Sequence, residues 1–421
     1  MFPFTEDELQ HNPDAVSLKG IEELFNRSSA AMQVGREQML KPNAEKQVPH
    51  FGYSDLEYVT KLDSERMRKR IAYLAKKGAD VPVGYIRDAN GNLILASEAT
   101  GDKNRRKIIF PPQELRKIIR HLYPEWSRPD GIDGFVIGIC NFKGGVSKST
   151  TTLTLAQAMS LRGMRVLIVD LDPQATSTKW QTVVHIKEEH TCLDLFKNRS
   201  GDIKEKILPT YWPGIDLIPA HDALQKAEFY FTQTLKEGGH EQLYFFPREL
   251  RKLTAEYDLI VIDTPPSLNN LTLSALFASD GLVMPLPPSN PDLESAANFW
   301  RMYRDTLQQL DVDPQETIFQ FVKVMITKVE NNKSSQNMIE WMEKSYGPML
   351  AKTKIAKSAA ISSAADSFGT VYDVALGGAA KSRHGRDAAR NLYDDFAAEI
   401  AEKIYLYWAR QKYQQEKNQS N

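Results

Sequence analysis

The stretch that decides the fold is Phe135–Pro173, which reads FVIGICNFKGGVSKSTTTLTLAQAMSLRGMRVLIVDLDP. An apolar, β-branched run enters a Gly-rich loop that carries Lys143 and Lys148 and leads directly into a helical pattern. A second apolar run then ends in Asp170 and Asp172. Backbone N–H groups at a Gly-rich turn and a helix N-terminus bind phosphate, and carboxylates at strand ends bind Mg²⁺. The stretch therefore predicts a site for a nucleoside triphosphate.

Length and composition narrow the classes of protein to consider. A chain of 421 residues exceeds one ordinary core and predicts two or three domains. The formal net charge is −1, so nucleic-acid binding would need local basic patches. Two cysteines favour a reducing compartment and are too few for a Cys-ligated iron–sulfur cluster within one chain. With no signal peptide and no bilayer-length apolar run, we expect a cytoplasmic protein without a membrane partner.

Three regions are expected along the chain. Residues 1–45 contain a helical pattern that fits either local packing or dimerisation. Residues 46–126 form a smaller, helical, DNA-binding domain, and the Pro- and Gly-rich segment SRPDGIDG at 127–134 predicts a boundary. Residues 134–421 form the nucleotide-binding domain with its C-terminal helices.

The pattern in residues 46–126 is typical of a winged helix-turn-helix. A capping box from Ser54 to Glu57 predicts a short helix, and a longer basic helix follows until Gly78 stops it. Asn90-Gly91 between two β-rich runs predicts a hairpin wing. The alternative is a helical domain with ordinary solvated charges. On the first interpretation, the expected DNA contacts on the basic helix are Arg66, Arg68, Lys69 and Arg70.

The second domain alternates β and α patterns, which predicts an α/β, doubly wound fold with a mostly parallel sheet. Its strands are nearly continuous in apolar residues, as expected when helices cover both faces. The expected strands are Phe135–Asn141, Arg165–Asp170, Ile215–Pro219, Leu259–Asp263, Leu282–Leu286 and Phe319–Thr327. The main expected helices are Ser149–Arg162, Leu271–Ala278, Leu293–Leu310, Ser335–Tyr346 and Asp387–Gln411, followed by a disordered tail, EKNQSN.

The loop supplies the groups that a triphosphate needs. Lys148 meets the β- and γ-phosphates, and the Ser149 hydroxyl binds Mg²⁺. The strict P-loop pattern fails at Phe142 and Ser147, where glycine would stand. An apolar strand ending in Asp263 supplies the expected Mg²⁺-holding carboxylate. The expected nucleotide contacts in the loop are Gly144, Gly145, Val146, Ser147, Lys148, Ser149 and Thr150.

The motifs KGGVSKST, VDLDPQ and VIDTPPSLNNLT, in this order, resemble those of the ParA/MinD group of deviant Walker-A ATPases. The resemblance implies slow, Mg²⁺-dependent hydrolysis of ATP to ADP. It implies that Lys143 reaches the partner subunit's phosphates in a nucleotide-sandwich homodimer, and that Asp172 orients the attacking water. Asp170 would support the metal bound by Asp263. The resemblance carries over, more weakly, three residues bordering the adenine: Pro287, Pro288 and Thr327.

The basic N-terminal domain gives the chain the layout of the large (type Ia) ParA-type plasmid partition ATPases, which it resembles. That resemblance implies an operator-binding, autorepressing N-terminal domain and an ATPase half that binds non-specific DNA on the nucleoid. It also implies stimulation by a centromere-binding ParB-type partner. Expected non-specific DNA contacts lie among C-terminal basic residues, chiefly Lys357, Arg383 and Arg386.

Two other functions remain open on the sequence. One is a membrane-associated, MinD-like positioning ATPase, because the last helix is amphipathic. Against it, Phe396, Ile400, Ile404 and Tyr407 form a stripe that a closing helix would bury in its own core. The other is a transcriptional regulator that only senses ATP, which the presence of Asp172 disfavours.

Overall fold

The computed structural model describes residues 27, 48–60, 63–78, 80–88, 92–97, 108–182, 184–236, 242–312, 318–373 and 383–420. The chain divides into two compact units, residues 1–45 and residues 46–421. The helix expected in the first unit lies outside the described residues, apart from the single helical residue Arg27.

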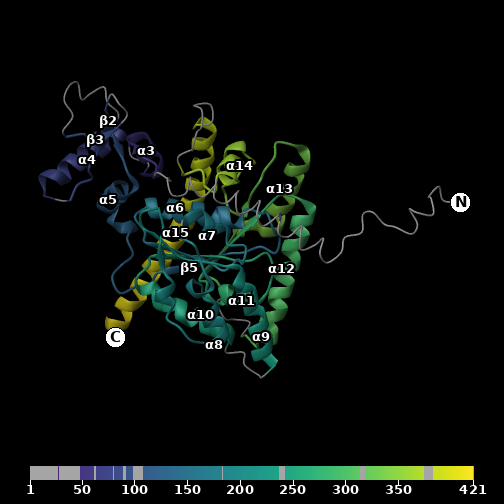
Figure 1. Ribbon diagram of the computed structural model, residues 1–421. Coiled ribbons are helices and arrows are strands. Elements are labelled where there is room, and N and C mark those ends of the chain that lie inside the picture. Colours follow the sequence, from purple (N-terminus) through teal and green to yellow (C-terminus); the bar gives the residue numbers. More distant parts are fainter. Residues whose placement is uncertain are drawn as a thin grey trace. The chain divides into compact units, whose positions relative to one another are not determined.

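A seven-stranded sheet forms the centre of the second unit (Figure 1). Its order is β11-β10-β5-β9-β6-β8-β7, and every neighbouring pair is parallel except β7 with β8. This confirms the doubly wound, mostly parallel α/β fold. The short antiparallel edge strand β7 was not predicted. The strands are β5 Phe135–Ile139, β6 Val166–Asp170, β7 Leu208–Pro209, β8 Ile215–Ile218, β9 Leu259–Asp263, β10 Gly281–Leu286 and β11 Phe321–Ile326.

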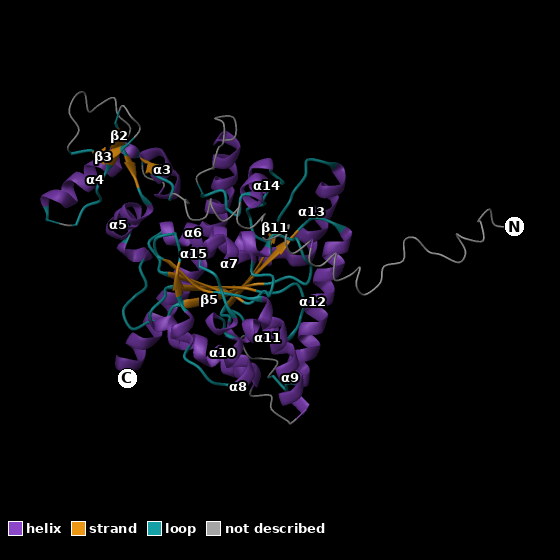
Figure 2. Cartoon of the chain, viewed as in Figure 1, coloured by secondary structure: helices purple, strands orange, loops and turns teal. Residues whose placement is uncertain are grey.

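Helices cover both faces of this sheet (Figure 2). Successive side chains of a strand point to opposite faces, so Ile137 of β5 packs in one core with α6 and α15 while Val136 packs in the other with α8 to α12. This explains why the central strands are apolar at nearly every position, the exceptions being Asp170 and Asp263 at the ends of β6 and β9. The helices are α6 Lys148–Leu161, α7 Thr176–Gln181, α8 Leu193–Asn198, α9 Lys226–Lys236, α10 Gln242–Arg251, α11 Asn270–Ala278, α12 Asn290–Gln309, α13 Lys333–Tyr346, α14 Ala359–Asp366 and α15 Arg383–Ser420.

The long helix α15 closes one face of the sheet. Phe396, Ile400 and Ile404 are buried, as the stripe predicted, but Trp408 completes the buried stripe and Tyr407 is only half-buried. The expectation of a disordered tail was wrong, because the helix continues through it to Ser420. The residues concerned are mostly good helix formers, which explains the continuation.

The region before residue 127, named the winged region after its predicted wing, contains short helices and a small antiparallel sheet. Strands β2 and β3 form an antiparallel hairpin, as predicted, although Asn90-Gly91 lies outside the described residues. Strand β4 joins β2 to β1 in a four-stranded sheet ordered β1-β4-β2-β3. The elements are β1 Phe51–Gly52, α3 Tyr53–Thr60, α4 Ser64–Lys76, β2 Tyr85–Arg87, β3 Leu93–Leu95, β4 Ile109–Phe110 and α5 Pro112–Leu122.

The predicted capping box is wrong. Helix α3 starts at Tyr53, and the backbone N–H of Gly52 donates to the Asp55 carboxylate at 2.7 Å. Glu57 instead accepts from the backbone N–H of Ser64 at the start of α4. The two helices are therefore joined by a side chain of the first that caps the second.

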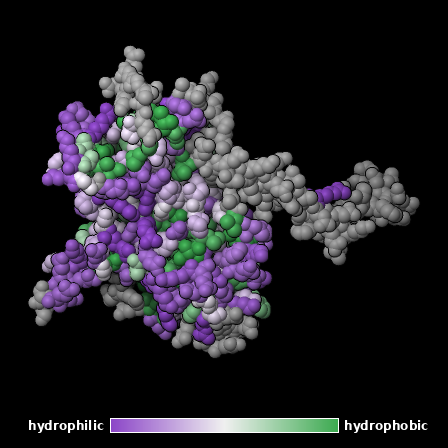
Figure 3. Space-filling model, turned by 60° about the vertical axis from the view of Figure 1, so that its left-hand side comes forward, coloured by the Kyte–Doolittle hydropathy of each residue, from purple (hydrophilic) through white to green (hydrophobic). Residues whose placement is uncertain are grey.

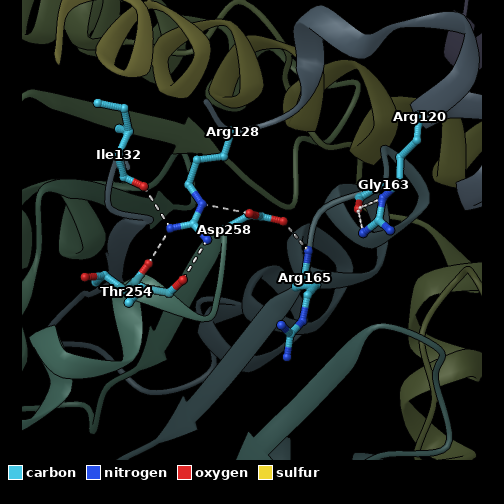
Figure 4. A network of polar contacts seen from close by, with 8 residues as sticks. Arg120, Arg128, Ile132, Gly163, Arg165, Thr254 and Asp258 are labelled. Carbon is cyan, nitrogen blue, oxygen red and sulfur yellow. Dashed lines mark hydrogen bonds and ion pairs between the residues drawn. The ribbon is translucent and has the colours of Figure 1, made fainter. Parts of the chain in front are cut away.

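Three arginines join the winged region and the linker to the nucleotide-binding core. Arg116 of α5 is buried and donates to the carbonyls of Ser160 at 2.9 Å and Met164 at 2.7 Å, at the end of α6. Arg120 donates to the Gly163 carbonyl, and Arg128 pairs with Asp258 at 3.0 Å (Figure 4). These three basic side chains therefore serve packing within the unit. The segment expected as a boundary is held by hydrogen bonds to the core.

On the face drawn in Figure 3, hydrophobic residues form separate patches among mostly hydrophilic ones. None of the described helices combines the length and the apolarity needed to cross a bilayer.

Candidate nucleotide-binding site

The Gly-rich loop connects β5 to α6 at the carboxyl edge of the sheet, where ligands of such folds bind. Gly145 and Ser147 both adopt positive φ, 73° and 80°. A left-handed residue that is not glycine costs roughly 1–2 kcal/mol, so Ser147 occupies a position where glycine is cheaper. The Ser147 carbonyl accepts from the backbone N–H and the hydroxyl of Thr151, at 2.9 and 2.7 Å. The departure from the strict motif therefore preserves the loop-to-helix turn.

Lys148, the first residue of α6, folds back over the loop. Its Nζ donates to the Lys143 carbonyl at 3.0 Å, and the side chain is buried. Burial lowers the pKa of Lys148, and the carboxylates of Asp263 and Asp172 oppose that shift. A buried ammonium at a helix N-terminus is a strong site for phosphate oxygens.

Lys143, the second lysine, points elsewhere. Its Nζ forms an ion pair with Asp292 at 2.9 Å, and its side chain is 42% exposed against 9% for Asp292. Its backbone N–H donates to the Asn141 side chain, which in turn donates to the Pro285 carbonyl. Asp292 lies in the first turn of α12, where its carboxylate accepts from the Ser289 hydroxyl. The lysine is thus held within its own subunit at the rim of the loop.

Asp263 ends β9 beneath the loop. One carboxylate oxygen accepts from the Ser177 hydroxyl at 2.7 Å, and Ser149 also hydrogen-bonds to the carboxylate. The other oxygen, Oδ1, is buried and has no hydrogen-bond partner among the described residues. Burial raises the pKa of Asp263 to about 6. A buried carboxylate oxygen without a donor, beside a hydroxyl, is the donor set that Mg²⁺ uses together with phosphates and waters.

Asp170 and Asp172 have different surroundings. Both oxygens of Asp170 are occupied, one by the backbone N–H of Asp172 and the other by the backbone N–H and hydroxyl of Thr178. Burial, and then Asp263, hold the pKa of Asp170 well above its usual range. Asp170 therefore positions the start of α7, and the carboxylate oxygen left to hold a metal would be Oδ1 of Asp263. Asp172 accepts from the Gln174 N–H, and burial raises its pKa. Asp172 follows β6, and β6 pairs with β9, which pairs with β5. The end of β6 therefore lies at the same edge of the sheet as the loop, although the two are separated in sequence.

The ends of β10 and β11 complete the rim. Pro287 and Pro288 follow β10 and precede the Ser289 cap of α12, next to the Lys143–Asp292 pair. The Thr327 hydroxyl donates to the Val146 carbonyl at 3.3 Å, and Lys328 donates to the Gly145 carbonyl. Among the described residues, no three His, Cys, Asp or Glu side chains form a metal cage.

The expected DNA contacts are surface groups with varied partners. On α4, Arg66 pairs with Asp63 and Lys69 with Glu65, while Arg68 lies over the Tyr53 ring. Arg70 and Lys77 both flank the ring of Tyr73, which is 51% exposed.

In the C-terminal part, Lys357 pairs with Glu330, and Arg386 donates to the Asp373 carbonyl. Arg383 begins α15, and its side chain lies outside the described residues, so the structure brings together no complete C-terminal cluster.

Sequence reasoning missed five residues that hold the site: Asn141, Ser177, Thr178, Asp292 and Lys328. Of these, Asp292 left a signal, because Ser289 and Asp292 have the spacing of a helix N-cap with an acidic first turn. Asn141 directly precedes the loop in sequence, whereas Ser177, Thr178 and Lys328 come from segments that only the folded sheet brings to the loop.

A strand, a Gly-rich loop, a buried lysine and a carboxylate on the adjacent strand define a P-loop nucleoside triphosphatase. A family model described as an AAA domain matches residues 134–313. Protein SopA of Escherichia coli K12 is 28% identical over 94% of this chain and 92% of its own length. Sporulation initiation inhibitor protein Soj of Bacillus subtilis is 31% identical over 55% of this chain and 87% of its own. A solved structure titled Partition Protein shares the fold with a TM-score of 0.60, at 20% identity, over 91% of this chain and 98% of its own.

The chain belongs to the ParA/MinD family of deviant Walker-A ATPases, as a member of its large, ParA-type partition branch. It is an ATPase.

Proposed function

We propose that this ATPase is a DNA-partition switch that dimerises around ATP, binds DNA in that state, and is returned to the monomer by hydrolysis. The observation that carries the proposal is the position of Lys143. It sits on the phosphate loop yet pairs with Asp292 at the rim, while Lys148 alone folds over the loop. A second, half-exposed cation at the mouth of a P-loop suits delivery to a partner subunit's nucleotide.

The residues of one subunit account for nucleotide binding. Lys148 and the N–H groups of the loop would meet the phosphates, and Ser149 with Asp263 would hold Mg²⁺. Bound there, Mg²⁺ would neutralise charge on the β- and γ-phosphates. Asp172 would accept a hydrogen bond from the attacking water and orient it. Pro287, Pro288 and Thr327 would border the adenine.

Closure of the dimer would depend on Lys143. Its ion pair with Asp292 has to open before the ammonium reaches the partner's phosphates, and loss of the γ-phosphate removes what holds the ammonium there. Lys143 thus has two states, one paired with Asp292 and one on the partner's phosphates, and the bound triphosphate favours the second, as in other nucleotide switches.

Two DNA-binding surfaces follow from the proposal. The winged region would bind the operator of its own operon through α4, where Arg66, Lys69 and Arg70 are exposed. Pairing with neighbouring acids does not exclude this, because exposed ion pairs contribute only about 0–1 kcal/mol and exchange readily for phosphate. The flanking of Tyr73 by Arg70 and Lys77 supports the assignment.

Non-specific DNA would be held by C-terminal basic groups, with Lys357, Arg383 and Arg386 as candidates. A ParB-type centromere-binding protein would stimulate hydrolysis and release the dimer from the nucleoid. Lys357 would have to exchange Glu330 for a phosphate, so this surface should be sensitive to salt.

The experiment that tests the proposal is a mobility shift on DNA of unrelated sequence with ATP, with ADP and without nucleotide. Binding should require ATP in the wild type. Lys148→Ala should lose it through loss of nucleotide, and Lys143→Ala should lose it while still binding ATP. Equal DNA binding with ATP and with ADP would contradict the switch.

A membrane-associated role is the weaker candidate. The apolar stripe of α15 is buried in the core of its own domain and is not available to lipid. Co-sedimentation with anionic vesicles should therefore show no ATP-dependent binding, and loss of residues 409–420 should not alter the result. The remaining alternative is a transcriptional regulator that binds ATP without hydrolysing it, and release of phosphate by the wild type would contradict this alternative.

A further inference from the structure

Lys328 is the candidate outside the residues used so far. It follows β11, is exposed, and adopts φ of 54°. Six described non-glycine residues have positive φ, and three of them, Ser147, Ala175 and Lys328, lie where the loop, α7 and β11 meet the nucleotide site. Strained backbone that persists at such a place points to a function.

The backbone of Lys328 is fixed on both sides. The Thr327 N–H donates to the Leu286 carbonyl at 3.1 Å, and the Val329 N–H donates to the Ile355 carbonyl at 3.0 Å. Between these two bonds, the left-handed turn places the Lys328 ammonium on the Gly145 carbonyl. The sheet therefore supports the unfavourable conformation, and the result is a contact to the phosphate loop.

That contact constrains the direction of a loop N–H. The Gly145 carbonyl and the Val146 N–H belong to one planar peptide group, and in a trans peptide the two point in opposite directions. Holding the carbonyl toward Lys328 therefore directs the Val146 N–H away from it, toward the interior of the loop. Thr327 does the same for the next peptide, since its hydroxyl donates to the Val146 carbonyl and so directs the Ser147 N–H inward.

We propose that Lys328 is a positioning residue of the nucleotide site, which holds the Gly145–Val146 peptide so that its N–H faces the phosphates. Lys328 touches the loop and not the reacting atoms, so it acts on nucleotide affinity and not on the hydrolytic step. The proposal requires nucleotide binding only, and it stands whether or not the dimer and the DNA surfaces are as described above.

The test compares Lys328→Met with Lys328→Arg in the full-length protein. Methionine keeps an unbranched side chain and the same cost of a positive φ but removes the charged donor, whereas arginine keeps a charged donor. Lys333→Met serves as the control, because Lys333 is exposed at the start of α13. The measurements are the Kd for a fluorescent ADP analogue with Mg²⁺, kcat at saturating ATP, and the thermal midpoint without nucleotide.

Lys328 is exposed, which weakens its charge-assisted hydrogen bond, so Lys328→Met should weaken ADP binding by roughly 5- to 20-fold, equivalent to about 1–2 kcal/mol. We expect kcat to change by less than about twofold, the midpoint to stay unchanged, and Arg to restore the Kd. Unchanged affinity in Lys328→Met would overturn the proposal. So would a loss confined to kcat, which would place Lys328 in hydrolysis, or a lowered midpoint that accounts for the loss.

Discussion

The ion pair of Lys143 with Asp292 leads to a prediction that separates the two states of the proposed switch. Asp292→Asn removes the negative charge but keeps the size of the side chain and an oxygen that accepts from Ser289. The pair holds Lys143 in its own subunit, whereas the proposed dimer needs it in the partner's site. Weakening the pair should therefore favour the dimer.

The size of the effect follows from the burial of the two groups. Lys143 is 42% exposed, so most of its charge is screened, while Asp292 is 9% exposed. Exposed pairs contribute about 0.2–1 kcal/mol, and the buried carboxylate places this one near 1 kcal/mol. Because a symmetric dimer opens two such pairs, the gain is about 2 kcal/mol, or roughly 30-fold in the dimer dissociation constant.

The assay is sedimentation equilibrium with a slowly hydrolysed ATP analogue. The matched control is Glu294→Gln, which removes the same charge from an exposed position two residues further along α12. Asp292→Asn should dimerise at lower protein concentration, and the control should behave as the wild type. An unchanged or weaker dimer in Asp292→Asn, with Lys143→Ala still monomeric, would refute the competition between the two partners of Lys143.

Three further predictions concern hydrolysis, the metal and the fold. Asp172→Asn should bind ATP and dimerise but lose at least about 100-fold in phosphate release, because the oriented water loses its acceptor; normal release would remove Asp172 from the mechanism. Burial raises the pKa of Asp263 to about 6, so protons compete with Mg²⁺ for this carboxylate. The Mg²⁺-dependent affinity for ADP, measured by calorimetry, should therefore fall about tenfold per pH unit below about pH 6. An affinity that does not change with pH would exclude Asp263 as a ligand. In the nucleotide-free protein the same raised pKa means that this group favours the folded state below about pH 3.8, and that the contribution is lost as the pH rises through about 6. Arg116→Met should lower the free energy of unfolding by about 2–3 kcal/mol in chemical denaturation, because the carbonyls of Ser160 and Met164 lose the donors that the buried guanidinium supplies. Lys117→Met on the same helix should cost less, and equal costs would contradict the role of the buried arginine.

Local sequence patterns were sufficient to predict the central sheet and the Gly-rich loop of this protein. Apolar runs with β-branched residues identified the central strands to within about two residues, because both faces of each strand are buried and every position is constrained alike. The order of strand, loop and helix predicted that Lys148 and Ser149 lie at the start of α6, as they do; their roles toward nucleotide and metal stay predictions. The Asn-Gly hairpin signal likewise predicted the pairing of β2 with β3.

The contacts that hold the loop could not be read in the same way. Asp292 lies in the first turn of α12, after β10, and Lys328 follows β11; these strands reach β5 only through the strand order of the sheet. The role of Arg116 on α5 could not be read from the sequence for a related reason. Arg116 has the same letter as a surface arginine, and only the packing of α5 on α6 turns it into a buried donor. The capping box at Ser54 was wrongly predicted because two carboxylates lie near the same turn. Asp55 accepts from the N–H of Gly52, while Glu57 accepts from the N–H of Ser64 in the next helix.

The most direct test of the central claim measures the assembly state in solution with ATP and with ADP, for the wild type and for Lys143→Ala, by light scattering at fixed protein concentration. The account predicts a dimer for the wild type with ATP, a monomer with ADP, and a monomer for Lys143→Ala with either nucleotide although it binds both. A Lys143→Ala protein that dimerises with ATP as the wild type does would contradict the account.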